Sequence, residues 1–243
     1  MTYITGDIHG DPRRLEQFFL SSAGQNGKTE PGDTVIILGD AGFNYFGDGR
    51  DRVPKEILHR DGNHTEYFCI HGNHEMRPQT IPSYHERRWH GGTVFVEDEF
   101  PNLLFAKDGE VYDIDGYSCL AIGGAYSIDK EYRLLYGYRW FPDEQPDNVI
   151  KARVEDRLRI LDYRVDVVLS HTCPRKYEPV EVFLGGVDQR LVDKSTEDWL
   201  DSIEDRLDYK RWYCGHYHTE KAIDRLRFLY ESIEEFRVPD ETD

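Results

Sequence analysis

The chain has 243 residues and a formal net charge of −17, from 47 acidic and 30 basic residues. Its length is sufficient to bury a substantial core, and we expect one domain over residues 1–243, with an acidic tail over about 231–243. No apolar run reaches the roughly 18 residues of a membrane span, and no basic, apolar leader opens the chain, so we expect a protein of the cytoplasm without a membrane partner. The negative charge disfavours long nucleic acid as a substrate, because binding to phosphates depends on Lys and Arg.

The first part of the chain predicts strands joined by helices. Residues 2–5 are rich in β-favouring side chains, and a helix follows in which Pro12 suits the first turn and Leu15 belongs to the apolar face. Residues 34–38 form a continuous apolar run, typical of a strand buried on both faces, and a short helix is expected at residues 53–58. This order favours an α/β fold.

The middle of the chain is expected to be richer in β-structure. A third apolar run at residues 67–70 predicts a strand, and the charged residues 77–88 after it are expected to be irregular. Short β-type runs separated by turn residues between positions 93 and 123 predict an antiparallel meander. Residues 126–140 are dense in aromatic and charged side chains, and we expect no regular structure there.

The last part returns to alternating helices and strands. We expect a helix over residues 147–163, a strand over 165–170, a helix that begins at Ser195 with a capping box, a strand over 212–214, and a hairpin before the acidic tail, which we expect to be frayed. The first helix is expected to turn Val149, Val154, Leu158, Ile160 and Leu161 toward the core. The second is expected to bury Trp199, Leu200, Ile203 and Leu207.

The four cysteines are expected to be buried free thiols. They are Cys69, Cys119, Cys173 and Cys214. They lie far apart and form no C-x-x-C pair, and three of them lie in or at the ends of apolar runs. A disulfide framework is also unusual in a chain of this size.

Polar side chains with metal-binding atoms follow five of the expected strands. They are Asp7 and His9, Asp40, Asn73 and His74, His171, and His216 and His218. Because ligands of open α/β sheets gather at the carboxyl ends of strands, we expect these segments to converge. Glycines beside them, such as Gly39 and Gly72, suit tight turns near a crowded site. Each residue alone has an ordinary structural alternative, a helix cap or a core histidine, and the metal prediction depends on the whole set.

The mixture of Asp, Asn and His suits borderline divalent cations. Manganese is the first expectation, with iron and zinc as alternatives, and the lack of cysteine ligands argues against a structural zinc site. Seven donors fit two ions better than one. Two ions roughly 3.5–4 Å apart can share a carboxylate and a hydroxide, which suits in-line attack on phosphorus.

The five segments together resemble the motifs of the calcineurin-like metallophosphoesterase superfamily, and the resemblance extends to uncharacterised bacterial and phage members. It implies an α/β, four-layer αββα sandwich in which two central mixed β-sheets are flanked by helices. It implies that the first metal is held by Asp7, His9, Asp40 and His218, and the second by Asp40, Asn73, His171 and His216. Asp40 would bridge the ions and share the catalytic role with His74. Asn73 and His74 would lie beside the phosphate, and His74 would protonate the leaving oxygen.

One part of the family pattern is missing. Protein phosphatases and dinucleoside tetraphosphate hydrolases of this superfamily carry an Arg after the second motif, whereas Gly39-Asp40 is followed here by Ala-Gly-Phe-Asn-Tyr. A bidentate Arg clamp on phosphate is not easily replaced. We expect Tyr126, Lys130 or Arg133 to reach the substrate instead, with Arg77 as a further candidate. The alternative for the segment around residue 130 is a solvated charged loop.

These observations predict a dinuclear metal-dependent phosphoesterase that uses a metal-bridging hydroxide, with a phosphomonoester of a small molecule, nucleotide or phosphoprotein as its substrate. The alternative is a phosphodiesterase that acts on cyclic nucleotides or as a nuclease. A protein-binding scaffold without catalysis is the third alternative, and the intact motif residues disfavour it. The sequence favours neither a monomer nor an oligomer.

Overall fold

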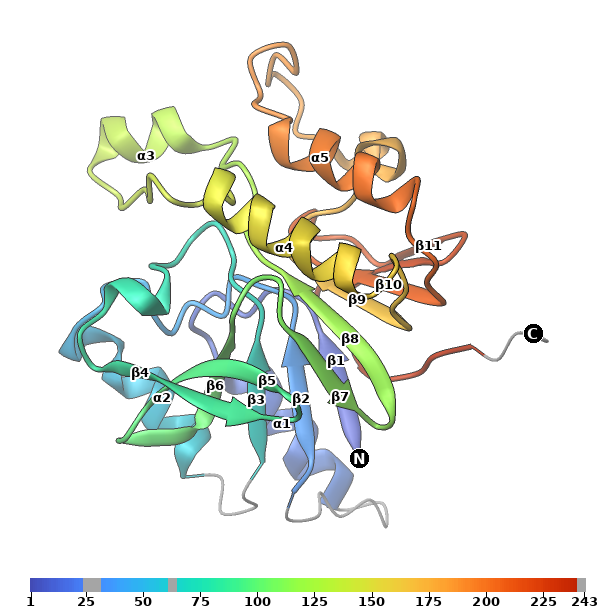
Figure 1. Cartoon of the computed structure of the whole chain (residues 1–243). Coiled ribbons are helices and arrows are strands. Elements are labelled where there is room, and N and C mark those ends of the chain that lie inside the picture. Colours follow the sequence, from blue (N-terminus) through green and yellow to red (C-terminus); the bar gives the residue numbers. More distant parts are fainter. Residues whose placement is uncertain (24–31, 61–64, 240–243) are drawn as a thin grey trace.

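The computed structural model describes residues 1–23, 32–60 and 65–239, and in these residues thirteen strands form two mixed sheets (Figure 1). The first sheet has the order β13 (Ile233–Glu235), β1 (Thr2–Thr5), β2 (Thr34–Ile37), β3 (Glu66–Cys69), β6 (Phe100–Ala106), β5 (Gly92–Glu97) and β4 (Tyr84–Trp89). The second has the order β11 (Lys221–Ile223), β12 (Leu226–Phe228), β10 (Arg211–Cys214), β9 (Val167–Ser170), β8 (Tyr117–Ile122) and β7 (Val111–Ile114).

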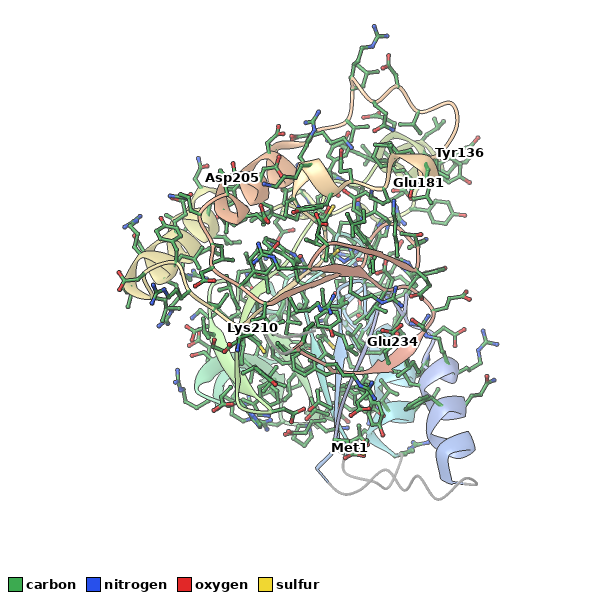
Figure 2. The ribbon with its side chains drawn as sticks, turned by 90° about the vertical axis from the view of Figure 1, so that its right-hand side faces the viewer. Met1, Tyr136, Glu181, Asp205, Lys210 and Glu234 are labelled. Carbon is green, nitrogen blue, oxygen red and sulfur yellow. The ribbon has the colours of Figure 1, made fainter. Side chains whose placement is uncertain are left out.

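The helices of the described residues lie on the outer faces of the sheets and at one end. They are α1 (Arg13–Ala23), α2 (Arg52–His59), α3 (Lys130–Tyr136), α4 (Asn148–Ile160) and α5 (Ser195–Glu204). Four short 3₁₀ turns are η1 (Gly49–Asp51), η2 (Pro78–Thr80), η3 (Arg175–Tyr177) and η4 (Val180–Val182). Figure 2 places Tyr136 of α3 and Glu181 of η4 at the end of the molecule opposite Met1. None of the helices in the described ranges has the length and apolarity needed to cross a membrane.

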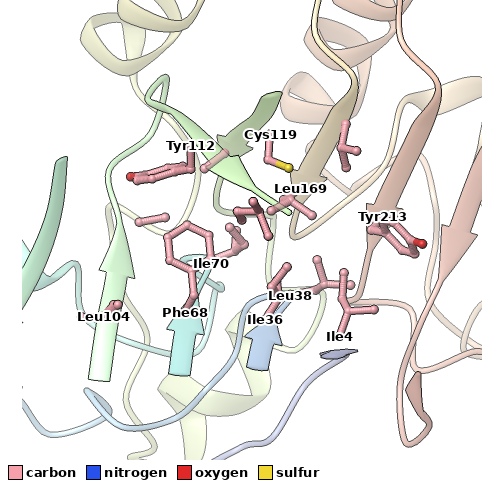
Figure 3. Close-up of a cluster of buried hydrophobic side chains, with 14 of the residues drawn as sticks. Ile4, Ile36, Leu38, Phe68, Ile70, Leu104, Tyr112, Cys119, Leu169 and Tyr213 are labelled. Carbon is pink, nitrogen blue, oxygen red and sulfur yellow. The ribbon is translucent and has the colours of Figure 1, made fainter. Parts of the chain in front are cut away.

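Three apolar clusters show that the molecule has four layers. The central cluster joins side chains of both sheets, among them Ile36 and Phe68 from the first and Leu169 from the second (Figure 3). A second cluster packs α4 and α5 on the outer face of the six-stranded sheet, and a third packs Leu15 of α1 and Leu58 of α2 on the outer face of the seven-stranded sheet. The expected α/β sandwich of two mixed sheets flanked by helices is therefore confirmed.

The strand β2 shows why a continuous apolar run indicates a strand that is buried on both faces. Successive side chains of a strand point to opposite faces. Ile36 accordingly enters the central cluster, whereas Val35 and Ile37 enter the cluster under α1 and α2. Both faces of this strand are covered, so no polar residue is needed on either face.

The parallel order of the central strands brings the functional segments to one place. In the first sheet β1, β2 and β3 are parallel neighbours, and in the second β8, β9 and β10 are parallel neighbours. The strand ends of the two sheets also contact each other, since the His216 backbone N–H donates to the Asp7 carboxylate at 3.0 Å.

Two segments expected to be irregular form regular structure. Residues 84–89 are the edge strand β4, whose charged side chains are largely exposed and whose backbone pairs with β5 in antiparallel register. Residues 130–136 form the helix α3, which buries no side chain and ends at Gly137 in the left-handed conformation. Neither element has an apolar periodicity, because neither has a fully buried face, and the sequence pattern therefore missed both.

The β-rich region is not one meander. β5 and β6 form an antiparallel hairpin in the first sheet, and β7 and β8 form another in the second. β6 and β8 then pair in parallel with β3 and β9, respectively. Local turn signals predict hairpins correctly, but they do not say which sheet a hairpin joins.

Several smaller expectations are also corrected. In α4 the buried side chains are Ile150, Val154 and Leu158, spaced four apart, whereas Val149 and Ile160 are 67% and 75% exposed. The helix α5 begins at Ser195 as expected and buries the predicted stripe, but its N-cap residue is Lys194 and makes no side-chain cap hydrogen bond.

The four cysteines are free and buried, as predicted.

The acidic tail is also more ordered than expected. Residues 233–235 form β13, which pairs antiparallel with β1, and Phe236 is buried in the central cluster. The last four residues, 240–243, lie outside the described part of the chain.

Candidate metal centre

The predicted ligands follow five strands, and the structure brings them together. Asp7 and His9 follow β1, Asp40 follows β2, Asn73 follows β3, His171 follows β9, and His216 and His218 follow β10. Three of these strands belong to the seven-stranded sheet and two to the six-stranded sheet. The centre therefore lies where the two sheets meet.

The first group of donors contains Asp7, His9 and His218. The Nε2 atom of His218 lies 3.1 Å from Asp7 Oδ2 and 3.1 Å from the Nε2 atom of His9. His9 Nδ1 lies 3.9 Å from Asp40 Oδ2, so Asp40 borders this group. One ligand atom of each of the three residues lies within 4.8 Å of the others, which is a spacing that one metal ion can span.

The second group contains Asp40, Asn73, His171 and His216. The Oδ1 atom of Asn73 lies 2.8 Å from His171 Nε2 and 3.1 Å from His216 Nδ1. His171 Nε2 also lies 3.7 Å from Asp40 Oδ1. Asp40 therefore borders both groups, as a bridging carboxylate would, and Asp7 also comes within 4.8 Å of Asp40 and His171.

The hydrogen bonds around His171 leave electron pairs that face each other. Its Nδ1 lies 2.8 Å from the Leu38 carbonyl oxygen, which can only accept, so the neutral ring has its lone pair on Nε2. The Asn73 amide is oriented by a hydrogen bond from Nδ2 to Ser127 Oγ at 2.8 Å, and its Oδ1 acceptor thus points at this lone pair. Two acceptors at 2.8 Å repel unless a proton or a metal ion lies between them. The donor set therefore fits divalent metal ions.

The backbone near the centre is held in unusual conformations. His9, Asp40, His216 and His218 all have positive φ angles, between 45° and 65°. Non-glycine residues adopt this region rarely, and clusters of such residues are found at functional sites. Gly72 is required for a different reason, the lack of space for a side chain. A Cβ atom at this position would lie 2.0 Å from Asp40 Oδ1. A side chain at position 72 would thus displace the Asp40 carboxylate.

Burial and charge keep the acidic donors ionised and one histidine neutral. Burial raises the pKa of Asp40, but the charge that His171, His74 and His9 carry when protonated lowers it by more, and the net pKa lies below the usual range. Burial lowers the pKa of His216 to about 3, so its ring is neutral and can act as a ligand. Burial together with the Asp40 charge raises the pKa of Glu75 to about 8.

His74 stands beside this centre and has a different set of neighbours. Its backbone N–H donates to Asp40 Oδ1 at 2.8 Å, and its Nε2 lies 4.0 Å from Asp40 Oδ2. The guanidinium of Arg133 comes within 3.3 Å of the same Nε2 atom. Burial lowers the pKa of His74, and the charge of Asp40 opposes this effect. A histidine and an arginine thus lie side by side at the edge of the donor cluster.

Of the four candidates for substrate binding outside the motifs, two lie at the centre and two elsewhere. Tyr126 lines a pocket of about 320 Å³ that opens at the centre, and Arg133 contacts His74. Arg77 is buried, donates to Asp108 at 2.7 Å and lines a different cavity. The ammonium of Lys130 lies over the Trp140 ring, 4.0 Å from its centre. Packing has therefore brought one of the three cations to the centre.

Sequence reasoning missed Ser127 and Asp129, which position other residues of the site. Ser127 orients Asn73, and Asp129 orients Arg133 through an ion pair of 2.7 Å. Glu75 accepts from the backbone N–H groups of Gly72 and Gly42, both at 3.2 Å, and so joins two of the ligand loops. Only Glu75 belonged to a recognisable motif. Ser127 and Asp129 could have been suspected only from their place beside Lys130 and Arg133.

Comparisons with known proteins agree with this arrangement. The calcineurin-like phosphoesterase family matches residues 2–220, and the chain belongs to that family. It is therefore a phosphoester hydrolase of a family that uses two divalent metal ions. The crystal structure of the phosphopantetheinyl hydrolase PptH from Mycobacterium tuberculosis is similar, with a TM-score of 0.50 and 14% sequence identity, over 100% of this chain and 97% of that chain. This likeness concerns the fold alone. No curated protein matched the sequence.

Proposed function

We propose that this phosphoesterase hydrolyses phosphomonoesters of small molecules. The observation that carries the proposal is the convergence of seven donor residues from both sheets beside a pocket of about 320 Å³. This volume lies at the lower end of the range of about 300–1,000 Å³ for small-molecule sites. A small organic group is therefore a better match than a phosphoprotein or a long nucleic acid.

Two sets of residues would hold the two metal ions. Asp7, His9, Asp40 and His218 would hold one metal ion, and Asp40, Asn73, His171 and His216 the other. When bound, two divalent ions supply positive charge for the phosphate oxygens and make a nucleophilic water available near neutral pH. The hydrogen bonds to Leu38 and Ser127 hold the His171 ring and the Asn73 amide in place.

His74 and Arg133 would act on the phosphate from the other side. Protonated His74 can give its proton to the leaving oxygen, and the hydrogen bond from its backbone to Asp40 holds it at the correct edge of the site. Arg133 can stabilise charge on the phosphoryl oxygens and replaces, in part, the Arg that the second motif lacks. The pairing with Asp129 orients its guanidinium.

The test is a pair of assays with manganese-loaded protein. We expect hydrolysis of 4-nitrophenyl phosphate with a kcat/KM clearly above that for bis(4-nitrophenyl) phosphate, and no hydrolysis of either after chelation. A strong preference for the diester would reverse the assignment to monoesters. If neither ester were hydrolysed with manganese, iron or zinc, the proposed function itself would be rejected.

A further inference from the structure

The pocket beside the candidate metal centre has an apolar wall in addition to the donor residues. Val182, Phe183 and Leu184, from η4 and the segment after it, form one part, and Val192 and Ile128 extend it. Phe183 is stacked on Tyr217, with ring centres 6.2 Å apart and planes inclined by 16°. The same pocket is lined at its other end by His74, His216 and His218. It is thus a continuous space from the metal centre to an apolar surface.

A polar group without a partner also lines this space. Glu197 of α5 is 3% exposed, and its Oε1 accepts a hydrogen bond from Thr172 at 2.7 Å. Its Oε2 has no hydrogen-bond partner among the residues that the structure describes. A buried polar atom of this kind is costly unless something satisfies it. Small-molecule sites commonly combine an apolar lining with one or two such groups, which orient the ligand.

The charges of the pocket disfavour a second anionic group. The cation nearest the apolar wall, Lys194, is bound to Glu178 at 2.6 Å and lies over the Phe183 ring. Asp129, Asp193 and Glu197 also line the pocket. Among the described residues that line the pocket, a leaving group with further phosphates or carboxylates would therefore find no free Lys or Arg and would face acidic side chains.

We propose that this pocket binds the leaving group of the substrate and selects the phosphomonoester of a neutral, amphiphilic alcohol. An apolar chain next to the phosphate would pack on Phe183 and Val182, and a hydroxyl or amide farther along the chain would bond to Glu197 Oε2. This inference rests on the proposed phosphoesterase function. It adds the identity of the organic group, for which the sequence motifs carry no information.

Two segments next to the residues that line the pocket also carry many exposed apolar side chains. Most of the exposed large apolar side chains of the described residues belong to the region of α3 or to residues 180–191. Figure 2 shows these regions, marked by Tyr136 and Glu181, at the same end of the molecule. In a chain with a net charge of −17, apolar side chains gathered at one end of the molecule favour an uncharged organic group.

The first experiment measures phosphate release from ethyl, butyl and hexyl phosphate by the manganese-loaded protein. These esters have leaving groups of similar basicity, so differences report on binding of the chain. We expect kcat/KM to rise about two- to fourfold for each buried methylene. Phe183→Ala should flatten this dependence. Ile160→Ala should retain it, because Ile160 of α4 is 75% exposed and does not line the pocket.

The second experiment tests Glu197 with 4-hydroxybutyl and 6-hydroxyhexyl phosphate. For the length that reaches Oε2, the wild-type protein should prefer the hydroxylated ester to the alkyl ester by at least severalfold, and Glu197→Leu should reverse this preference. If Glu197→Leu did not fold, the wild-type preference alone would still decide. A wild-type protein that preferred the alkyl ester at both lengths would overturn the role of Glu197.

Calorimetric binding of ethyl- and hexylphosphonate provides a measurement without turnover. We expect tighter binding and a more negative heat-capacity change for the longer chain. Good turnover without dependence on chain length in either measurement would overturn the pocket proposal and leave the phosphoesterase function standing. Conversely, length-dependent binding without hydrolysis of any ester would reject the function and retain the pocket.

Discussion

His74 contacts the centre without belonging to either donor group. Its ring lies 4.0 Å from Asp40 and 3.3 Å from Arg133, at the edge of the pocket. We expect His74→Asn to lower kcat by about 10²–10⁴-fold, the usual contribution of a general acid. Metal content should not change, because the predicted ligands are other residues. Steady-state assays and metal analysis after desalting would check both statements.

The matched control for this variant is His85→Asn, since His85 lies on the edge strand β4 and its side chain is 49% exposed. The control should retain both activity and metal. Loss of metal in His74→Asn would show that His74 is a ligand, and unchanged kcat would show that the proton comes from elsewhere.

Arg133 and Lys130 are close in the sequence but have different surroundings. Arg133 reaches His74, whereas Lys130 lies over Trp140. A charge-assisted hydrogen bond contributes about 1.5–3 kcal/mol, so Arg133→Ala should lower kcat/KM by about 10–100-fold. Lys130→Ala should leave kcat/KM within about twofold. If the Lys130 variant were the impaired one, the guanidinium would not be the phosphate-binding cation.

The sequence could predict the donor residues better than the residues around them. Asp7, Asp40 and His171 directly follow apolar strands or their glycine turns, so the strand pattern alone places them at one edge. The three candidate cations could not be separated in this way. Arg133 is 59 residues from His74, and tertiary packing decides which cation reaches His74 and which is engaged by Asp108 or Trp140.

Among the secondary-structure elements, the strand β13 differs most from the sequence prediction of a frayed tail. It lies in a segment that charge alone marks as a tail, yet it closes the edge of the first sheet beside β1. Phe236 holds it there, with only 6% of the side chain exposed. The apolar residues Ile233, Phe236 and Val238 are spaced by three and then by two positions, which fits no single period, so a sequence pattern could not reveal this strand.

We expect Phe236→Ala to destabilise the fold by about 3 kcal/mol, since it removes a large buried side chain near the end of the chain. Arg237→Ala is the neighbouring control and should change stability by less than about 0.5 kcal/mol, because its side chain is 77% exposed. Urea denaturation of both variants would measure the difference. Equal stabilities would mean that residues 233–236 do not pack as a strand in solution.

At the scale of the whole molecule, the metal centre connects the two sheets. Asp7, Asp40 and Asn73 come from ends of the first sheet, and His171, His216 and His218 from ends of the second. The layers are otherwise joined mainly through the central apolar cluster. Metal binding in the folded state should therefore stabilise the assembly of the sheets as well as supply the chemistry, because the donors are not preassembled in the unfolded chain.

This arrangement predicts a metal-dependent stability. Manganese at about 100 times its dissociation constant should stabilise the folded chain by about 2.7 kcal/mol, which corresponds to a rise in Tm of about 5–10 °C over protein in a chelator. His218→Ala should lose much of this rise, because His218 lies 3.1 Å from Asp7 in the first donor group. His85→Ala should retain it. The contradicting outcome is a Tm that does not change at a manganese concentration that supports hydrolysis. It would mean that the donor cluster is equally stable without the ions. Metal binding and the packing of the two sheets would then not be linked.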